Sequence, residues 1–560
     1  MSRIATTTDA DMMSGVDLKR VAAGNAVVDT ENQQEELTWK MMFKKERFGM
    51  LCSYFMVGMT YGTALSLVYP IYNIYLNSPS NVVNTANSFM VLAFSFKAFY
   101  GFLSDSVPIF GMRRKPYLIL GWILCVCATI AMIVFILTGA KSQACYTKNP
   151  EGGYTKHLLP ESAEICTGRK IYDLSNFDGF IFALFLLFQN IGYMFADVSM
   201  DSLSIEWARR ESEAGRGQIQ ANNYVARSVG FMLTALIIGF GFNYAPYGGE
   251  WESGLSLEAY FILLACIQAA GLPFYFWLQD DKVSSCEVPS FKEQTKSVYE
   301  LLSNKGFATL ILFNLLFGIC NYTMGVGQNN VPNDWISMQP CIKALNNVWT
   351  YVLMIVTLWF SGRYLRGISW RWLQSISVFL VVLCGALYLP MAYGHLRTPL
   401  YYIFINTDTT IVQNIGYMIT MWSVNELALD GLEGTSLALA TTMTNVAMTL
   451  AQTYVTNMLG KPFPDLQQLA GPNVTHQYVM NYVVVSVVNL SALLFLWLLP
   501  NQKEDARARK ENWGNSKKFG IFMITFCFLL IAFNLLVVMG GMLCPGSPVF
   551  GGQGTDGCNQ

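Results

Sequence analysis

Long apolar segments recur along almost the whole chain, and they constrain its fold more than any other feature. Each is long enough to cross a hydrocarbon layer of about 30 Å, which takes about 20 helical residues. Because 53% of the 560 residues are hydrophobic and only 13% are charged, the sequence predicts an all-α, multi-pass integral membrane protein. Thirteen membrane-spanning helices are expected, at residues 48–76, 83–104, 117–139, 178–203, 218–242, 257–278, 306–327, 344–365, 369–393, 401–424, 434–459, 476–499 and 519–543.

Positive charge is concentrated in alternate loops between these segments. Short loops rich in lysine and arginine favour the cytoplasm, so the pattern predicts a cytoplasmic N-terminus. The loop at 140–177 is basic on the opposite side, but long loops translocate largely regardless of charge. We expect the plasma membrane as the location. The basic residues on the predicted cytoplasmic side include Lys44, Lys45, Arg47, Arg113, Arg114, Lys115, Arg209, Arg210, Arg216, Arg363, Arg366, Arg371, Lys503, Arg507, Arg509, Lys510, Lys517 and Lys518.

The segments and the polar stretches between them predict seven regions. Two six-helix bundles are joined by a charged cytoplasmic linker, and an extra helix follows the second bundle. The regions are a disordered cytoplasmic tail at 1–46, the first bundle at 47–279, the linker at 280–305, the second bundle at 306–500, a basic cytoplasmic segment at 501–518, the thirteenth helix at 519–543 and an outside tail at 544–560.

A six-residue repeat, QNIGYM, relates the two predicted bundles. It occurs at Gln189–Met194 in the fourth segment and at Gln413–Met418 in the tenth, six helices apart. Parallel repeats with this offset are typical of the major facilitator superfamily, so two pseudo-symmetric six-helix bundles are expected. Polar residues at this depth in both halves are candidates for substrate binding or gating: Gln189, Asn190, Tyr193, Gln413, Asn414 and Tyr417.

The two halves differ in charge just beyond the repeat. Asp197 aligns with Met421, and Asp201 aligns with Asn425. Lys97 in the second segment and Arg227 in the fifth fall at a similar predicted depth, so two cations are expected to meet two anions. Charged groups inside a membrane are costly and usually functional. Lys97, Asp197, Asp201 and Arg227 are therefore predicted to bind substrate, exchange protons or gate transport, although an ion-pair network that only joins helices is also consistent with the pattern.

The loop between the second and third segments reads GFLSDSVPIFGMRRKPY, from Gly101 to Tyr117. It combines a small residue, an aspartate at the membrane surface, a Pro and Gly turn and a basic triplet. The aspartate is expected to interact with a neighbouring helix N-terminus or arginine. The basic triplet is expected to keep the loop on the cytoplasmic side of the membrane. The pattern looks like the loop signature of major facilitator transporters, and its residues here are Gly101, Asp105, Pro108, Gly111, Arg113 and Arg114.

Three longer motifs resemble those of the folate-biopterin transporter family. They are FKAFYGFLSDSVPIFGMRRKPYLILGW at Phe96–Trp122, ADVSMDSLSIEWARRE at Ala196–Glu211 and NELALDGLEGTSLALATTMTN at Asn425–Asn445. One departure is Ala98, where the family usually has proline. The resemblance implies a secondary active transporter that moves folate, pterin or a related metabolite by alternating access, with a proton as a candidate coupling ion. Some relatives carry S-adenosylmethionine, so another organic solute of that kind is an alternative substrate.

Other classes of function are less consistent with the sequence. No HExxH motif is present, and the three histidines lie in or beside predicted outside loops, so neither an intramembrane enzyme, a metal site nor a cofactor is expected. Nucleic acid is not expected as a partner; the expected partners are a small-molecule substrate and the lipid bilayer. A nutrient sensor that binds without transport stays an alternative. Outside cysteines Cys145 and Cys166, and Cys544 and Cys558, could form disulfides, and Asn473 begins a glycosylation sequon.

Overall fold

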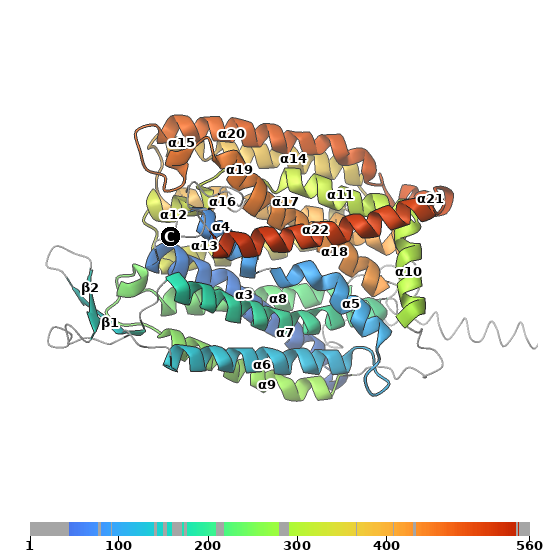
Figure 1. Ribbon diagram of the computed structural model, residues 1–560, viewed down its shortest axis with the longest axis horizontal. Coiled ribbons are helices and arrows are strands. Elements are labelled where there is room, and N and C mark those ends of the chain that lie inside the picture. The colour runs from blue at the N-terminus through green and yellow to red at the C-terminus, as the bar shows by residue number, and fades with distance from the viewer. Residues whose placement is uncertain are drawn as a thin grey trace, which may run out of the picture.

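The computed structural model describes residues 44–547, apart from 77–79, 91, 139–142, 149–153, 160–170, 173–175, 209–217, 279–290, 366, 407, 429–432 and 545–546. Within this part of the chain, helices form two stacked bundles with one long helix running between them (Figure 1). The loop at 107–114 and helices α10 and α21 lie at one end, here called the basic end. The three strands lie at the opposite end, here called the strand end.

The first bundle holds the six segments predicted before the linker. Two of its helices are irregular. Pro70 stands at the start of the π-helix that ends the first segment, and a 44° bend between Phe89 and Leu92 divides the second segment. The elements are α3 (Lys45–Val68), η1 (Tyr69–Tyr75), α4 (Ser80–Met90), η2 (Leu92–Phe96), α5 (Lys97–Ser106), α6 (Lys115–Thr138), α7 (Asn176–Ala208), α8 (Gln218–Gly241), η3 (Ala245–Tyr247) and α9 (Leu257–Phe276).

The second bundle repeats this arrangement with different breaks. The elements are α11 (Lys305–Asn321), η4 (Gln328–Asn330), α12 (Val331–Asp334), α13 (Pro340–Phe360), η5 (Ser361–Leu365), α14 (Trp370–Ala386), α15 (Leu389–Ala392), α16 (Pro399–Asn406), α17 (Asp408–Leu427), α18 (Glu433–Thr449), η6 (Leu450–Val455), α19 (Thr456–Gly460), η7 (Pro464–Leu466), α20 (Val474–Ser491) and η8 (Ala492–Leu498).

Nine helices among the described residues are long and apolar enough to span a membrane, and the bent pair at 82–89 and 92–104 makes a tenth. The other predicted spans are helical too. α11 is apolar but only 17 residues long, and α17 and α18 carry many polar residues. The predicted helical bundles and the extra helix are therefore present in the structure. Hydropathy alone is a weak guide where a helix is short or lines the interior.

A small sheet occupies part of the long loop that follows α6. Strand β1 (Gln143–Lys148) pairs antiparallel with β2 (Tyr154–Leu159) and with β3 (Ile171–Tyr172), in the order β2-β1-β3. The sequence analysis predicted only an outside loop here. Cys145 lies on β1 opposite His157, but Cys166, its predicted disulfide partner, lies outside the described residues. Cys544 is disulfide-bonded, and Cys558 also lies outside the described residues.

Three further helices complete the fold. α10 (Phe291–Ser303) links the bundles at the basic end. α21 (Lys503–Asn512) lies at the same end against the second bundle, where the buried Arg509 donates to the carbonyl oxygens of Leu498 and Leu499. α22 (Lys517–Leu543) runs between the bundles (Figure 1). Its Met523 packs in the core of the second bundle. Because Val538 packs in the core of the first, α22 crosses the seam from one half to the other.

Candidate functional site

The four charged residues predicted to meet do so, between α5, α7 and α8. Lys97 Nζ lies 2.6 Å from Asp201 Oδ2 and 3.1 Å from Asp197 Oδ2. Arg227 Nη1 lies 3.3 Å from Asp197 Oδ1. Lys97, Asp197 and Asp201 are 7%, 0% and 6% exposed. Two cations and two anions sum to zero, so the group, here called the charge cluster, is buried as a neutral unit and avoids the cost of an unpaired charge.

The two carboxylates of the charge cluster are held differently. Asp197 contacts both cations, one with each oxygen. Among the described side chains, Asp201 contacts the single cation Lys97, and its other oxygen accepts from the Tyr54 hydroxyl at 2.8 Å. A neutral phenol stabilises a carboxylate less than a guanidinium does. Asp201 is therefore the carboxylate that can accept a proton at the lower electrostatic cost.

Two aromatic rings lie beside the cation of Arg227. Its guanidinium carbon lies 5.8 Å from the Tyr61 ring centroid and 5.7 Å from that of Phe231. Phe231 also stacks on Tyr351 of α13, which belongs to the second bundle. These cation–π contacts fix the orientation of Arg227 and place it beside the seam.

The charge cluster lies next to the seam between the halves. The Ala98 backbone N–H, adjacent to Lys97, donates to Thr442 Oγ1 of α18 at 3.0 Å. The hydroxyls of Tyr224 on α8 and Tyr417 on α17 are hydrogen-bonded to each other. A change at the charge cluster can therefore alter the contacts between the two bundles directly.

The first copy of the repeat is part of a buried polar network inside the first bundle. Gln189 Nε2 donates to Thr129 Oγ1 of α6. Thr129 donates to Gln268 Oε1 of α9 at 3.0 Å, and Gln268 donates to Thr60 Oγ1 of α3 at 3.0 Å. All four side chains are fully buried. This arrangement gives Gln189 the geometry of a residue that joins helices.

The other predicted residues of that copy are also buried in the first bundle. Asn190 and Tyr193 are fully buried. The Tyr193 ring lies 6.0 Å from that of Tyr61, which in turn faces Arg227. Tyr61 therefore links Tyr193 to Arg227 of the charge cluster.

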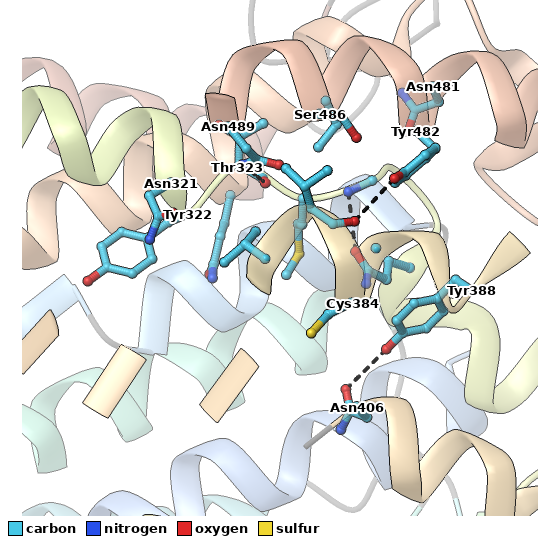
Figure 2. A pocket seen from close by; sticks show the side chains of 18 of the residues that line it. Asn321, Tyr322, Thr323, Cys384, Tyr388, Asn406, Asn481, Tyr482, Ser486 and Asn489 are labelled. Atoms are coloured by element: carbon cyan, nitrogen blue, oxygen red, sulfur yellow. Dashed lines mark hydrogen bonds between the residues drawn. The ribbon is translucent and has the colours of Figure 1, made fainter. Parts of the chain in front are cut away.

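The second copy of the repeat faces a cavity instead. Gln413 lines a space of about 120 Å³ between α11, α14, α17 and α20, whereas Asn414 is turned back to donate to the Thr410 carbonyl oxygen at 2.8 Å. Figure 2 shows amide and tyrosine side chains from these helices and their neighbours arranged around the space. Tyr417, one turn beyond Gln413, meets Tyr224 at the seam. The same six residues thus have a packed environment in one half and an open one in the other.

The packing around the glycine of each repeat copy accounts for part of the difference between the two environments. It leads to a prediction for a pair of matched variants. A methyl group added at Gly192 would lie 2.7 Å from the Cys125 nitrogen on α6, whereas one at Gly416 meets only the Gln374 side chain, at 3.5 Å. We expect Gly192→Ala to cost about 1–3 kcal/mol through overpacking. Gly416→Ala should be neutral or stabilising, because alanine is the better helix former. Thermal stability of the detergent-solubilised variants checks this, and equal losses would contradict it.

The loop signature folds as a tight turn at the basic end. Gly111 has φ of 74°, which favours glycine, and Ile109 and Met112 form a bridge across the turn. Pro108 lies just after Gly101–Ser106, the end of α5. Arg114 donates to Ser104 Oγ at 2.9 Å, while the Asp105 side chain, whose interaction was predicted, lies outside the described residues. Arg114 thus ties the turn to α5, and the basic residues Arg113 and Arg114 lie together beside it.

Sequence reasoning missed a set of asparagines that joins the halves at the strand end. Asn73 donates to Asn330 Oδ1 at 3.3 Å, and Asn84 donates to Asn457 Oδ1 at 3.3 Å. Asn329 donates to Asn84 in turn. No local signal identifies such pairs, because the partners are more than 240 residues apart. These residues, here called the asparagine seam, join the two halves at the strand end through uncharged hydrogen bonds.

Comparison with known proteins agrees with the fold and with the predicted resemblance. The profile of the BT1 family matches residues 65–147. The chain is 25% identical over 178 residues to the probable folate-biopterin transporter 4 of Arabidopsis thaliana, a match that covers 32% of this chain and 27% of that protein. It is 22% identical over 432 residues to the folate-biopterin transporter of Synechocystis sp., covering 75% of this chain and 74% of that protein.

Solved structures show the same fold. A D-xylose-proton symporter superimposes with a TM-score of 0.56 at 12% identity, covering 82% of this chain and 98% of that one. A POT family transporter in complex with 5-aminolevulinic acid gives 0.54 at 13%, covering 83% and 99%. At these identities the structures establish the major facilitator fold alone. The two curated relatives and both solved structures are named as transporters or symporters.

Proposed function

We propose that this chain, a multi-pass membrane transporter similar to the folate-biopterin transporters, moves folate, pterin or a related metabolite by alternating access. The observation that carries the proposal is the buried, neutral charge cluster beside the seam of two pseudo-symmetric bundles. A merely structural ion pair has no need to border the surface where the halves must move. The names of the relatives supply the substrate class.

The contacts across the seam are suited to repeated opening. At the strand end they include the asparagine seam and the Ser88–Thr453 hydroxyl pair, and deeper in they include the Ala98–Thr442 and Tyr224–Tyr417 hydrogen bonds. A charged contact, from Gln339 Nε2 to Glu250 Oε1, also joins the halves at the strand end. Neutral hydrogen bonds contribute about 0.5–1.5 kcal/mol each, and water can replace them when the seam opens. Rocking of one bundle against the other therefore costs little per contact.

The charge cluster couples the rocking of the bundles to the binding of substrate. A carboxylate of a folate tail competes with Asp201 for Lys97, because both are anions and Lys97 already bridges two of them. Protonation of Asp201 frees Lys97 for the substrate and keeps the net charge of the site near zero. In this mechanism Asp201 carries the coupling proton, Lys97 binds the substrate carboxylate, and Arg227 holds Asp197 in place.

Positive charge at the basic end supports an orientation. Arg113, Arg114, Arg371, Arg507 and Arg509 belong to the elements at this end, so we propose that it faces the cytoplasm and that the strand end faces outside. We place the protein in the plasma membrane. The exposed Asn473 then faces the outside, where its sequon can be glycosylated.

Uptake of labelled solutes tests the proposal. Folic acid, biopterin and S-adenosylmethionine are offered to a transport-deficient host that expresses the chain, with surface expression matched between variants. We expect uptake of folic acid or biopterin that rises at acidic outside pH. Asp201→Asn, which mimics the protonated carboxyl group, should retain binding and lose the pH response.

Three outcomes contradict parts of the proposal. Uptake of S-adenosylmethionine alone would replace the substrate class, and it would favour the aspartates as the counter-charge for a cation. Binding without flux for every solute would identify a sensor. An unchanged pH response in Asp201→Asn would remove Asp201 from the coupling step.

A further inference from the structure

Lys343 lies between the two halves, in the first turn of α13, whose N-cap residue Gln339 contacts the first bundle at the strand end. Its Nζ donates to the Tyr402 hydroxyl of α16 at 3.2 Å. The same Nζ lies 5.6 Å from the ring centroid of Tyr69, which belongs to η1 of the first bundle. The Tyr69 hydroxyl in turn donates to the Met338 carbonyl oxygen of the second bundle. The Lys343 ammonium group is therefore held at the seam by one aromatic side chain from each half.

This ammonium group has no counter-ion in the described part of the chain. None of the ion pairs found there includes Lys343, and the Tyr402 hydroxyl is the one acceptor that it reaches among the described residues. An ammonium group carries three N–H donors, so two of them stay available. Ionisable groups within a membrane are normally paired, because an uncompensated charge is costly. The four residues of the charge cluster follow this rule, whereas Lys343 does not.

The direction of the side chain separates Lys343 from an ordinary lysine at a helix end. Such lysines extend their charged group outward to the membrane surface. Here Nζ is directed inward, between Tyr69 and Tyr402, which are 7% and 3% exposed. The position of Lys343 therefore favours a role in the interior and not an anchoring role at the surface.

Lys343 begins a polar face of α13 that runs along the seam toward the charge cluster. Asn347 and Tyr351 follow it at spacings of four residues, so the three side chains lie on one side of the helix, here called the α13 face. The Tyr351 ring stacks on Phe231 of α8 with the ring centroids 5.2 Å apart, and Phe231 contacts Arg227. Eight residues of helix, about 12 Å, separate Lys343 from Tyr351. Because both ends of the α13 face contact the first bundle, Asn347 between them faces the same seam.

The α13 face is open enough for a solute to reach it. Lys343, Asn347 and Tyr351 are all half-buried. The Asn347 side chain makes no hydrogen bond in the described part of the chain, and its amide atoms are not among the enclosed polar atoms found there. An accessible amide thus follows an accessible cation along the path from the strand end to the charge cluster.

We propose that Lys343 binds a carboxylate of the transported solute near the strand end, and that the α13 face guides this group inward toward Arg227 and Lys97. The inference rests on the proposed function for transport. Carboxylate oxygens take the N–H donors that Lys343 leaves open and form stronger hydrogen bonds than the neutral Tyr402 hydroxyl does. The positive end of the α13 dipole adds to the attraction. A single ammonium group compensates one negative charge, which favours a carboxylate over a doubly charged phosphate.

Binding to the purified, full-length protein in lipid nanodiscs tests this inference. The probes are p-aminobenzoyl-glutamate, which carries two carboxylates, and biopterin, which carries none. Calorimetry gives each Kd. Lys343→Gln removes the charge and keeps a polar side chain, whereas Lys343→Arg keeps the charge. Lys461→Gln is the matched control, because it removes the same charge from an exposed lysine that follows α19.

We expect Lys343→Gln to raise the Kd of p-aminobenzoyl-glutamate about tenfold or more, the value of a hydrogen bond to a charged group, and to leave biopterin binding unchanged. Lys343→Arg should retain most of the affinity, and Lys461→Gln should bind like the wild type. Asn347→Leu should weaken binding of p-aminobenzoyl-glutamate about three- to tenfold, the value of one neutral hydrogen bond.

Four results would overturn the inference. They are a wild-type protein that does not bind p-aminobenzoyl-glutamate, a Lys343→Gln variant that binds it normally, an equal loss for both probes in Lys343→Gln, and a loss in Lys343→Arg as large as that in Lys343→Gln. The last two would identify Lys343 as a residue that only holds the seam together.

Uptake measurements separate this inference from the proposed function. Uptake of folic acid with an unchanged KM in Lys343→Gln would contradict the Lys343 site and leave folate transport standing. Binding of p-aminobenzoyl-glutamate that depends on the charge of Lys343, without uptake of any solute by the wild type, would support the site and contradict transport.

Discussion

Replacing Lys97 with alanine is expected to abolish uptake and to destabilise the protein by about 3–5 kcal/mol. The substitution leaves Asp197 and Asp201 buried with the single cation Arg227, and an unpaired charge in a low-dielectric interior is costly. Uptake in matched vesicles gives the first effect, and the thermal midpoint of the solubilised protein gives the second.

A double variant separates a structural role of Lys97 from a functional one. Lys97→Ala combined with Asp201→Asn removes one cation and one anion, so the neutral pair of Arg227 and Asp197 remains. The amide that replaces the Asp201 carboxylate keeps an oxygen that can accept from Tyr54, as the carboxylate does now. We expect most of the stability to return while uptake stays lost. If uptake returns together with stability, the charge cluster only joins helices.

The charge cluster could be predicted from the sequence because its signal is local. Ionisable residues in apolar segments are few, and counting residues from the helix ends gives their depth. The sequence therefore predicts that four charged residues meet, and they do so in the structure: Lys97, Asp197, Asp201 and Arg227. The same count cannot identify Tyr54 as the second partner of Asp201, because a tyrosine in a transmembrane helix is common and its direction depends on packing.

The environments of the two repeat copies could not be predicted. QNIGYM is identical in both halves, yet Gln189 is hydrogen-bonded in a buried network and Gln413 lines a cavity. The difference arises on neighbouring helices, where Cys125 contacts the position of Gly192 and the Gln374 side chain faces Gly416. The asparagine seam was missed for the same reason, since its contacts depend on how two distant bundles meet. Local patterns identify helices and charges, whereas pairing between helices depends on the assembled fold.

Replacing Gly58 with alanine is expected to have the second large effect, because this glycine lets α3 and α8 cross closely behind the charge cluster. An added methyl group would overlap the Arg227 carbonyl oxygen and would lie 3.0 Å from the Gly230 Cα. The backbones must separate, which costs about 1–3 kcal/mol or more. The shift also moves Arg227 away from Asp197, now 3.3 Å distant. Displacements of about 1 Å at a site can lower a rate about 100-fold, so uptake should fall much further than stability.

Gly62→Ala is the matched control, since Gly62 lies one turn further along the same helix and faces the same neighbour. A methyl group there would approach side-chain carbons of Phe231 and Thr234 most closely, at 3.2 Å, and these can move by a few tenths of an ångström. We expect Gly62→Ala to keep most of its uptake and stability, and Gly230→Ala to behave like Gly58→Ala, because its methyl group would overlap the Phe55 carbonyl oxygen. Equal effects of Gly58→Ala and Gly62→Ala would show that this crossing does not position Arg227.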